Sequence, residues 1–228
     1  MFRIKKRKIA SIIMGKFPQY HEDQADQIEW IVLKNNSKTM LLISRYALIT
    51  TGYCDINKVN QDMCFMEWQN SLAHEICRQF YKTAFSPEEK EVILPKQFTD
   101  SEAGIADHVF LLSEGEVREL MPGSNLRKAK PTLYALEKGA RLGWTDDTRD
   151  YTSWWIMPET KEMKSEQYNA HKEIYPKAVF QNGDIQYHGR NVFHSDFTIR
   201  PCILINCEKF FSMSGNTGNK LKIGRAHV

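Results

Sequence analysis

The sequence predicts a single α+β domain with a mostly antiparallel sheet, two or three helices and a loop-rich face. Three observations lead to this class. Short apolar stretches with the alternating pattern of strands recur along the chain. Turn residues, among them Asn182-Gly183, connect some of these stretches at hairpin spacing. Two sequences of the capping-box type mark the starts of helices between the strands.

The first strand is expected around residues 9–14, after the basic residues of segment 3–8. A basic segment before an apolar run can also be a secretory signal. This run is short, Gly15-Lys16 interrupts it, and no small-x-small cleavage site follows. We therefore predict no signal peptide and expect a cytoplasmic or phage-associated protein.

A hairpin is expected next. Residues 28–34 (IEWIVLK) place Ile28, Trp30 and Val32 on one face of a strand, and residues 35–37 form the turn. Residues 39–44 (TMLLIS) form the returning strand.

Helices are expected in the middle of the chain. One apolar stripe recurs every four residues, at Trp68, Leu72, Ile76 and Phe80. Ser86-Pro87-Glu88-Glu89 and Ser113-Glu114-Gly115-Glu116 match the capping box, in which the serine hydroxyl and the glutamate satisfy free amides. Residues 109–112 read as a buried strand before the second box, and a short helix over 132–138 should end at Gly139.

The second half is predicted to be rich in loops. Residues 141–176 show little periodicity around a short strand at 154–157. A hairpin over 178–187 and a last strand over 202–205 follow. We expect the segments near Ile12 and Ile203 to lie side by side in one sheet.

The predicted domain covers residues 1–210, and residues 211–228 are predicted to be a tail. The last seven residues, Lys222–Val228, correspond to the translation of a common sequencing adapter, so we exclude them from any site.

Composition excludes several classes of partner and cofactor. A net charge of +3 is too small to predict nucleic-acid binding, and no apolar run reaches the ~20 residues of a membrane span. The 5 cysteines are an odd number without a CxxC pair, so neither a disulfide framework nor a zinc site is indicated. We predict no metal and no cofactor, and treat His171, His188 and His194 as scattered surface histidines.

Several short motifs agree in order with a known family. They are Gly15-Lys16-Phe17-Pro18-Gln19, IEWIVL at 28–33, LLISRYAL at 41–48, Trp154-Trp155, Asn182-Gly183 and Arg200-Pro201. Over roughly residues 12 to 206 the chain resembles a family of domains of unknown function from gut bacteria of the Firmicutes type and their phages. That family is in turn similar to the C-type lectin-like fold of formylglycine-generating enzymes and of the variable proteins of diversity-generating retroelements.

This second resemblance implies that the terminal strands pair, that two helices lie on one side, and that a loop-rich face presents the binding site. Two departures from the family pattern matter. Ile156-Met157 stands where relatives commonly have the polar pair Arg-Ser, and Thr198 stands where they have glycine. Any polar role of the loop after Trp155 is therefore in doubt for this chain.

A ligand site is predicted from aromatic planes and charged groups, because planes stack on sugar rings while charges fix orientation. The candidate residues are Trp144, Trp154, Trp155, Asp184, Arg190 and Arg200. Neighbouring residues of a strand point to opposite faces, so at least one of Trp154 and Trp155 should be buried. Arg200 has the alternative role of a buried arginine that binds loop carbonyls.

These residues favour a non-enzymatic module that recognises carbohydrate or protein, and no catalytic centre is recognised. One alternative is a metal-dependent oxidase similar to formylglycine-generating enzymes, which requires Cys202 or Cys207 to be exposed in a cleft. The other is a structural component of a phage or surface assembly, which predicts an extended apolar patch and no concave pocket. The oligomeric state and the identity of the ligand are left open.

Overall fold

The first sheet of the protein is antiparallel and is built around the predicted hairpin. The computed structural model describes residues 10–55, 68–98, 106–157, 177–186, 193 and 195–217. Within them, the strand order of this sheet is β1 (Ser11–Pro18), β2 (Ala25–Asn35), β3 (Thr39–Ser44), β13 (Cys202–Asn206) and β5 (Ile93–Leu94), and β8 (Val109–Phe110) also pairs with β13. The turn at residues 35–37 is confirmed: Oδ1 of Asn36 accepts hydrogen bonds from the amides of Lys38 and Thr39.

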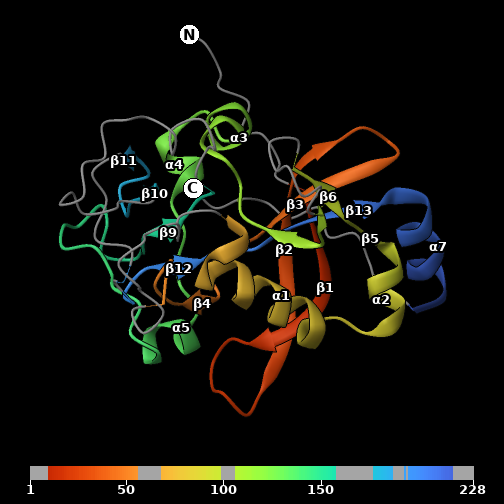
Figure 1. Ribbon diagram of the computed structural model, residues 1–228, viewed down its shortest axis with the longest axis horizontal. Helices are drawn as coiled ribbons and strands as arrows, with labels where there is room; N and C mark the ends of the chain where they lie inside the picture. The colour runs from red at the N-terminus through yellow and green to blue at the C-terminus, as the bar shows by residue number, and fades with distance from the viewer. Residues whose placement is uncertain are drawn as a thin grey trace, which may run out of the picture.

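The first and last predicted strands share this sheet, but they do not pair. Ile12 of β1 lies opposite Trp30, whereas Ile203 of β13 lies opposite Leu42. The β2–β3 hairpin thus lies between them and pairs with β1 on one side and with β13 on the other (Figure 1). The expectation that the two segments lie side by side is therefore wrong, although they do belong to one sheet.

A second sheet joins five two-residue strands. Its order is β11 (Ile185–Gln186), β10 (Ala178–Val179), β9 (Trp154–Trp155), β12 (Thr198–Ile199) and β4 (Ile49–Thr50). The strands β9 and β12 are parallel, and the other pairs are antiparallel. The predicted Asn-Gly hairpin is confirmed: Gly183 has a φ of 85° and donates its amide to the oxygen of Phe180. A separate small ribbon pairs β6 (Lys96–Gln97) with β7 (Ala106–Asp107).

The two helices predicted from capping boxes begin there, but the helix predicted along the stripe from Trp68 to Phe80 begins only at Leu72. The 3₁₀ turn η2 (Trp68–Asn70) precedes α1 (Leu72–Ala84), and α2 (Pro87–Val92) and α3 (Glu114–Leu120) both have complete capping boxes. The short helix α5 (Leu133–Glu137) ends before Gly139, whose φ is 99°. The four-residue helix α4 (Ser124–Arg127) is an addition to the predicted set.

The last helix, α7 (Cys207–Thr217), crosses residue 210, where we predicted the end of the domain. It follows β13 directly, and the side chain of Asn206 accepts a hydrogen bond from the amide of Lys209 in the first turn. Phe210 is buried within this helix. The start of the predicted tail, residues 211–217, therefore belongs to a helix, and residues 218–228 lie outside the described residues.

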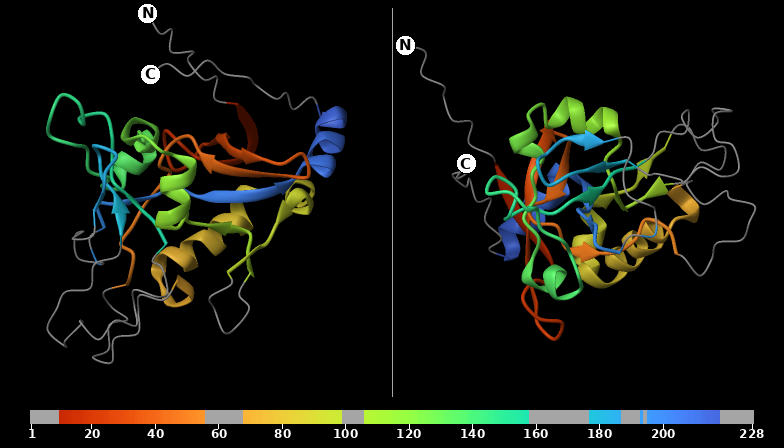
Figure 2. Two further views of the ribbon diagram at one scale, coloured as in Figure 1. Left: turned by 90° about the horizontal axis from the view of Figure 1, so that it is seen from above. Right: turned by 90° about the vertical axis from the view of Figure 1, so that its left-hand side faces the viewer.

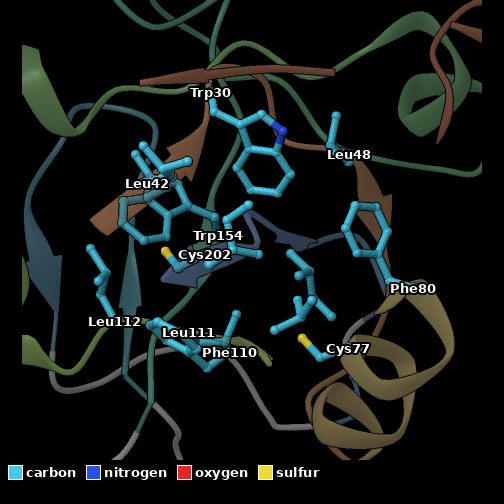
Figure 3. Packing of buried hydrophobic residues seen from close by; sticks show 14 of the residues in the cluster. Trp30, Leu42, Leu48, Cys77, Phe80, Phe110, Leu111, Leu112, Trp154 and Cys202 are labelled. Atoms are coloured by element: carbon cyan, nitrogen blue, oxygen red, sulfur yellow. The ribbon is translucent and has the colours of Figure 1, made fainter. Parts of the chain in front are cut away.

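One apolar cluster connects the two sheets and the helices. Figure 3 shows Trp30, Cys77, Trp154 and Cys202 within this cluster. The indole of Trp30 stacks on Phe85 with ring centroids 6.0 Å apart and donates to the oxygen of Met14. The structure confirms the α+β class with mostly antiparallel sheets. No described helix is long and apolar enough to cross a membrane.

Candidate functional site

The predicted site residues do not gather on one surface. Trp154, Trp155 and Arg200 are almost wholly buried, whereas Trp144 and Asp184 are exposed. Arg190 lies outside the described residues.

Both tryptophans of β9 are buried because both faces of the second sheet are covered. Trp155 packs against Phe197 with ring centroids 4.5 Å apart and donates its indole N–H to the oxygen of Thr51. Trp154 donates its indole N–H to the oxygen of Arg127 at 2.9 Å. The expectation that at least one of the pair is buried is confirmed, and their burial gives no support to a role in ligand contact.

Arg200 has the structural position that the sequence offered as its alternative. Its Nε donates to the main-chain oxygen of Ser44 at 2.8 Å, and its Nη2 lies 3.4 Å from the oxygen of Arg45. The guanidinium lies 5.5 Å from the ring centroid of Trp154. Burial lowers its pKa to about 10. Arg200 thereby joins the end of β3 to the segment between β12 and β13.

Asp184 is exposed, but its polar groups serve the hairpin turn. One carboxylate oxygen accepts from Nδ2 of Asn182 at 2.8 Å, and the Asp184 amide donates back to Oδ1 of the same asparagine at 3.0 Å. These two bonds orient the turn, so Asp184 is primarily a turn residue in this conformation.

Trp144 is the most exposed large apolar side chain of the described residues, at 77%. It lies in the segment between α5 and β9, which loops out at the end of the molecule opposite α7 (Figures 1 and 2). The guanidinium carbon of Arg141 lies 4.2 Å from the centroid of the Trp144 ring, in a cation–π contact. Arg141 in turn is attached to Asp196, because its amide donates to the oxygen of that residue at 3.1 Å.

The loop that carries Trp144 is held by its own hydrogen bonds. Gly143 donates its amide to the oxygen of Tyr151, and Oγ1 of Thr148 accepts from the amide of Thr145 at 3.1 Å. A Cβ atom on Gly143 would lie 2.2 Å from Oγ1 of Thr148, so only glycine fits there. The indole is thus presented from an ordered loop with a cation against one ring face. Trp144 was predicted from the sequence, but Arg141 was not. The pattern that could have indicated it is a basic residue three positions before an aromatic one.

A groove of about 700 Å³ lies elsewhere, beside β1, α2 and α7. Met14, Phe85 and Met213 contribute apolar side chains to its lining. The amide of Gly15 donates to Oε1 of Glu89 at 2.7 Å, so the capping glutamate of α2 also binds the strand. The groove was not predicted from the sequence, because it depends on where three distant segments meet.

The described residues offer no reactive thiol and no metal site. Cys202 and Cys207 are both buried, and burial raises the pKa of each thiol. The exposed cysteine that the oxidase alternative requires is therefore not found at either position. Within the described ranges, no group of three or more His, Cys, Asp or Glu side chains could hold a metal ion. His171, His188 and His194 lie outside those ranges.

Comparison with known proteins identifies one related family. The model of a family described as "Domain of unknown function (DUF6273)" matches residues 36–207, which is well over half of the chain. No curated protein and no solved structure matches the chain significantly.

Proposed function

The chain belongs to the DUF6273 family, and from this premise we propose that it is a non-enzymatic recognition module that binds carbohydrate or protein through Trp144. The observation that carries the proposal is the 77% exposure of a tryptophan held in an ordered loop. Exposing an indole to water is unfavourable in free energy, and a ligand that covers it removes this unfavourable exposure. Sugar rings and protein side chains can cover it, since both stack on aromatic planes.

The neighbourhood of Trp144 agrees with a recognition role. Arg141 contacts the indole and is itself 40% exposed as a side chain, so one ligand can meet an aromatic plane and a hydrogen-bonding cation together. Tryptophan and arginine are the residue types that most often dominate binding energy at interfaces. The bracing by Gly143 and Thr148 reduces the conformational entropy that binding would otherwise cost.

The C-type lectin-like scaffold is part of this proposal. Trp154-Trp155, the Asn182-Gly183 hairpin and the strand before Arg200-Pro201 come together in the second sheet, which supports the resemblance. The lack of pairing between β1 and β13 counts against it. Thr198 stands at the position of the expected glycine. Its side chain is buried there, and its hydroxyl donates a hydrogen bond to the main-chain oxygen of Ser153.

Trp144 can be observed selectively because the other four tryptophans are buried. Acrylamide should quench the Trp144 emission efficiently and the remaining emission weakly. A glycan panel is screened with the full chain, and binders are then titrated while acrylamide quenching is measured. A ligand at the site should protect Trp144 from the quencher.

The matched variants are Trp144→Ala and Tyr20→Ala, the latter removing another aromatic side chain that is 54% exposed. Trp144→Ala should weaken binding at least about tenfold, as expected for an interface tryptophan. Tyr20→Ala should leave binding unchanged. Equal affinity of Trp144→Ala and the unmodified chain for a glycan binder would overturn the proposal. A panel without any binder would leave protein surfaces as the ligand class.

A further inference from the structure

His74 on α1 has both ring nitrogens opposite hydrogen-bond acceptors. Its Nε2 lies 2.9 Å from Oδ1 of Asp107 in β7, and its Nδ1 lies 3.1 Å from the main-chain oxygen of Gln69. A neutral imidazole has one donor and one acceptor nitrogen, so it satisfies only one of these contacts. We propose that the folded protein holds His74 as the imidazolium cation, and that this cation is a pH-sensitive tie between α1, η2 and β7.

Both oxygens of the partner carboxyl group have polar contacts. Oδ2 of Asp107 accepts a hydrogen bond of 2.7 Å from the indole N–H of Trp68, while Oδ1 faces His74. The imidazolium form of His74 would give Oδ1 a donor as well, so that each oxygen of the carboxyl group would accept one hydrogen bond. The side chains of His74 and Asp107 are only 9% and 7% exposed, so water does little to weaken their attraction.

Among the residues that the structure describes, three further titratable groups lie near the pair. Cys77 follows on the next turn of α1, Tyr53 accepts the Ala73 amide with its main-chain oxygen, and His108 follows Asp107 in the chain. Burial raises the pKa of Cys77 and of Tyr53, so both stay uncharged near neutral pH. Burial also lowers the pKa of His108, which favours its neutral form. None of these three groups therefore carries a charge near neutral pH that would attract or repel the imidazolium of His74.

Loss of one ring proton has a defined structural consequence. A nitrogen lone pair would then face either the oxygen of Gln69 or the carboxylate of Asp107, and one of the two contacts would become repulsive. Either η2 or β7 would lose its attachment to α1. The amide of His74 is bonded to the Ser71 hydroxyl at 3.0 Å, so the start of α1 itself is held independently of the ring.

The test uses the full chain with isotope-labelled histidine. Near neutral pH, long-range proton–nitrogen correlation should show both ring nitrogens of His74 as protonated, with the signal assigned from the His74→Gln variant. Amide exchange of residues 68–71 and 106–107, corrected for its intrinsic pH dependence, should accelerate about tenfold or more when alkaline pH removes one ring proton.

Asp107→Asn keeps the shape of the partner and removes its charge, so His74 should become neutral near neutral pH and the pH-induced change in exchange should vanish. His108→Gln is the matched control and should leave both observations unchanged. A neutral tautomer of His74 in the folded chain near neutral pH, including one paired with a protonated Asp107, would overturn the proposal. So would an exchange transition that persists in Asp107→Asn. If His74→Gln does not fold, the His74 signal is assigned instead from its ring contacts with Trp68, whose ring centroid lies 5.0 Å away.

Discussion

Gly183 offers a direct test of how the second sheet is held against α4. It has a φ of 85°, and a Cβ atom built on it would lie 2.0 Å from the main-chain oxygen of Ser124 and 2.6 Å from its carbonyl carbon. That oxygen already accepts the amide of Lys128 across α4, so it is poorly free to move. Gly183→Ala should therefore combine backbone strain with a collision against main-chain atoms.

The magnitude follows from two contributions. The left-handed conformation costs an alanine about 1–2 kcal/mol, and inserting a methyl group into filled space costs about 1–3 kcal/mol. We expect Gly183→Ala to lower the free energy of unfolding by about 2–5 kcal/mol. Since small domains are stable by about 5–15 kcal/mol, the variant should still fold.

Gly139 provides the matched control, because its φ of 99° is similar but a Cβ atom there would meet nothing within 4 Å. Gly139→Ala should therefore cost only the strain, about 1–2 kcal/mol. In both variants alanine lowers the conformational entropy of the unfolded chain by the same amount. The difference between their free energies of unfolding therefore measures the collision alone. Urea unfolding followed by tryptophan fluorescence measures both. A loss in Gly183→Ala no larger than that in Gly139→Ala would refute the reasoning.

Two further predictions concern titrating groups. Cys54, Cys77, Cys202 and Cys207 are buried, and burial raises the pKa of all four thiols, that of Cys54 to about 12. A thiol reagent at about pH 8 should therefore label no more than one of the 5 cysteines rapidly before the protein unfolds. Rapid labelling of two or more would contradict the burial of these four side chains. Burial against the ring of Tyr81, which stacks at 4.5 Å, lowers the pKa of His108 below its ordinary 6.5, so the unfolded chain takes up this proton first as the pH falls. His108 therefore contributes stability above pH 6.5 that is lost below it, and an NMR titration giving a pKa at or above 6.5 would disprove this sign.

Local chemistry could be predicted from neighbouring residues. Ser86 and Ser113 begin helices because their hydroxyls and the glutamates three residues later satisfy the same free amides in any context. The β2–β3 hairpin and the Asn182-Gly183 turn likewise depend on residues a few positions apart. The exposed Trp144 was also selected from the sequence, although its residue type alone does not distinguish it from the other tryptophans.

Long-range arrangement was decided only by the tertiary structure. Strands of two residues, such as β4 and β12, carry no periodicity and exist because a partner strand lies beside them. Trp155 is buried because Tyr53 and Phe197 cover it. Arg200 is buried where its guanidinium donates to the main-chain oxygens of Ser44 and Arg45. The pairing of Arg141 with Trp144, and of His74 with Asp107, likewise required coordinates. The sequence by itself determined the two capped helices, the two hairpins and their turns, because those depend on neighbouring residues, whereas α4 and α7 were not predicted. The tertiary structure decided which polar and aromatic groups face solvent, because burial depends on contacts between residues far apart in the chain.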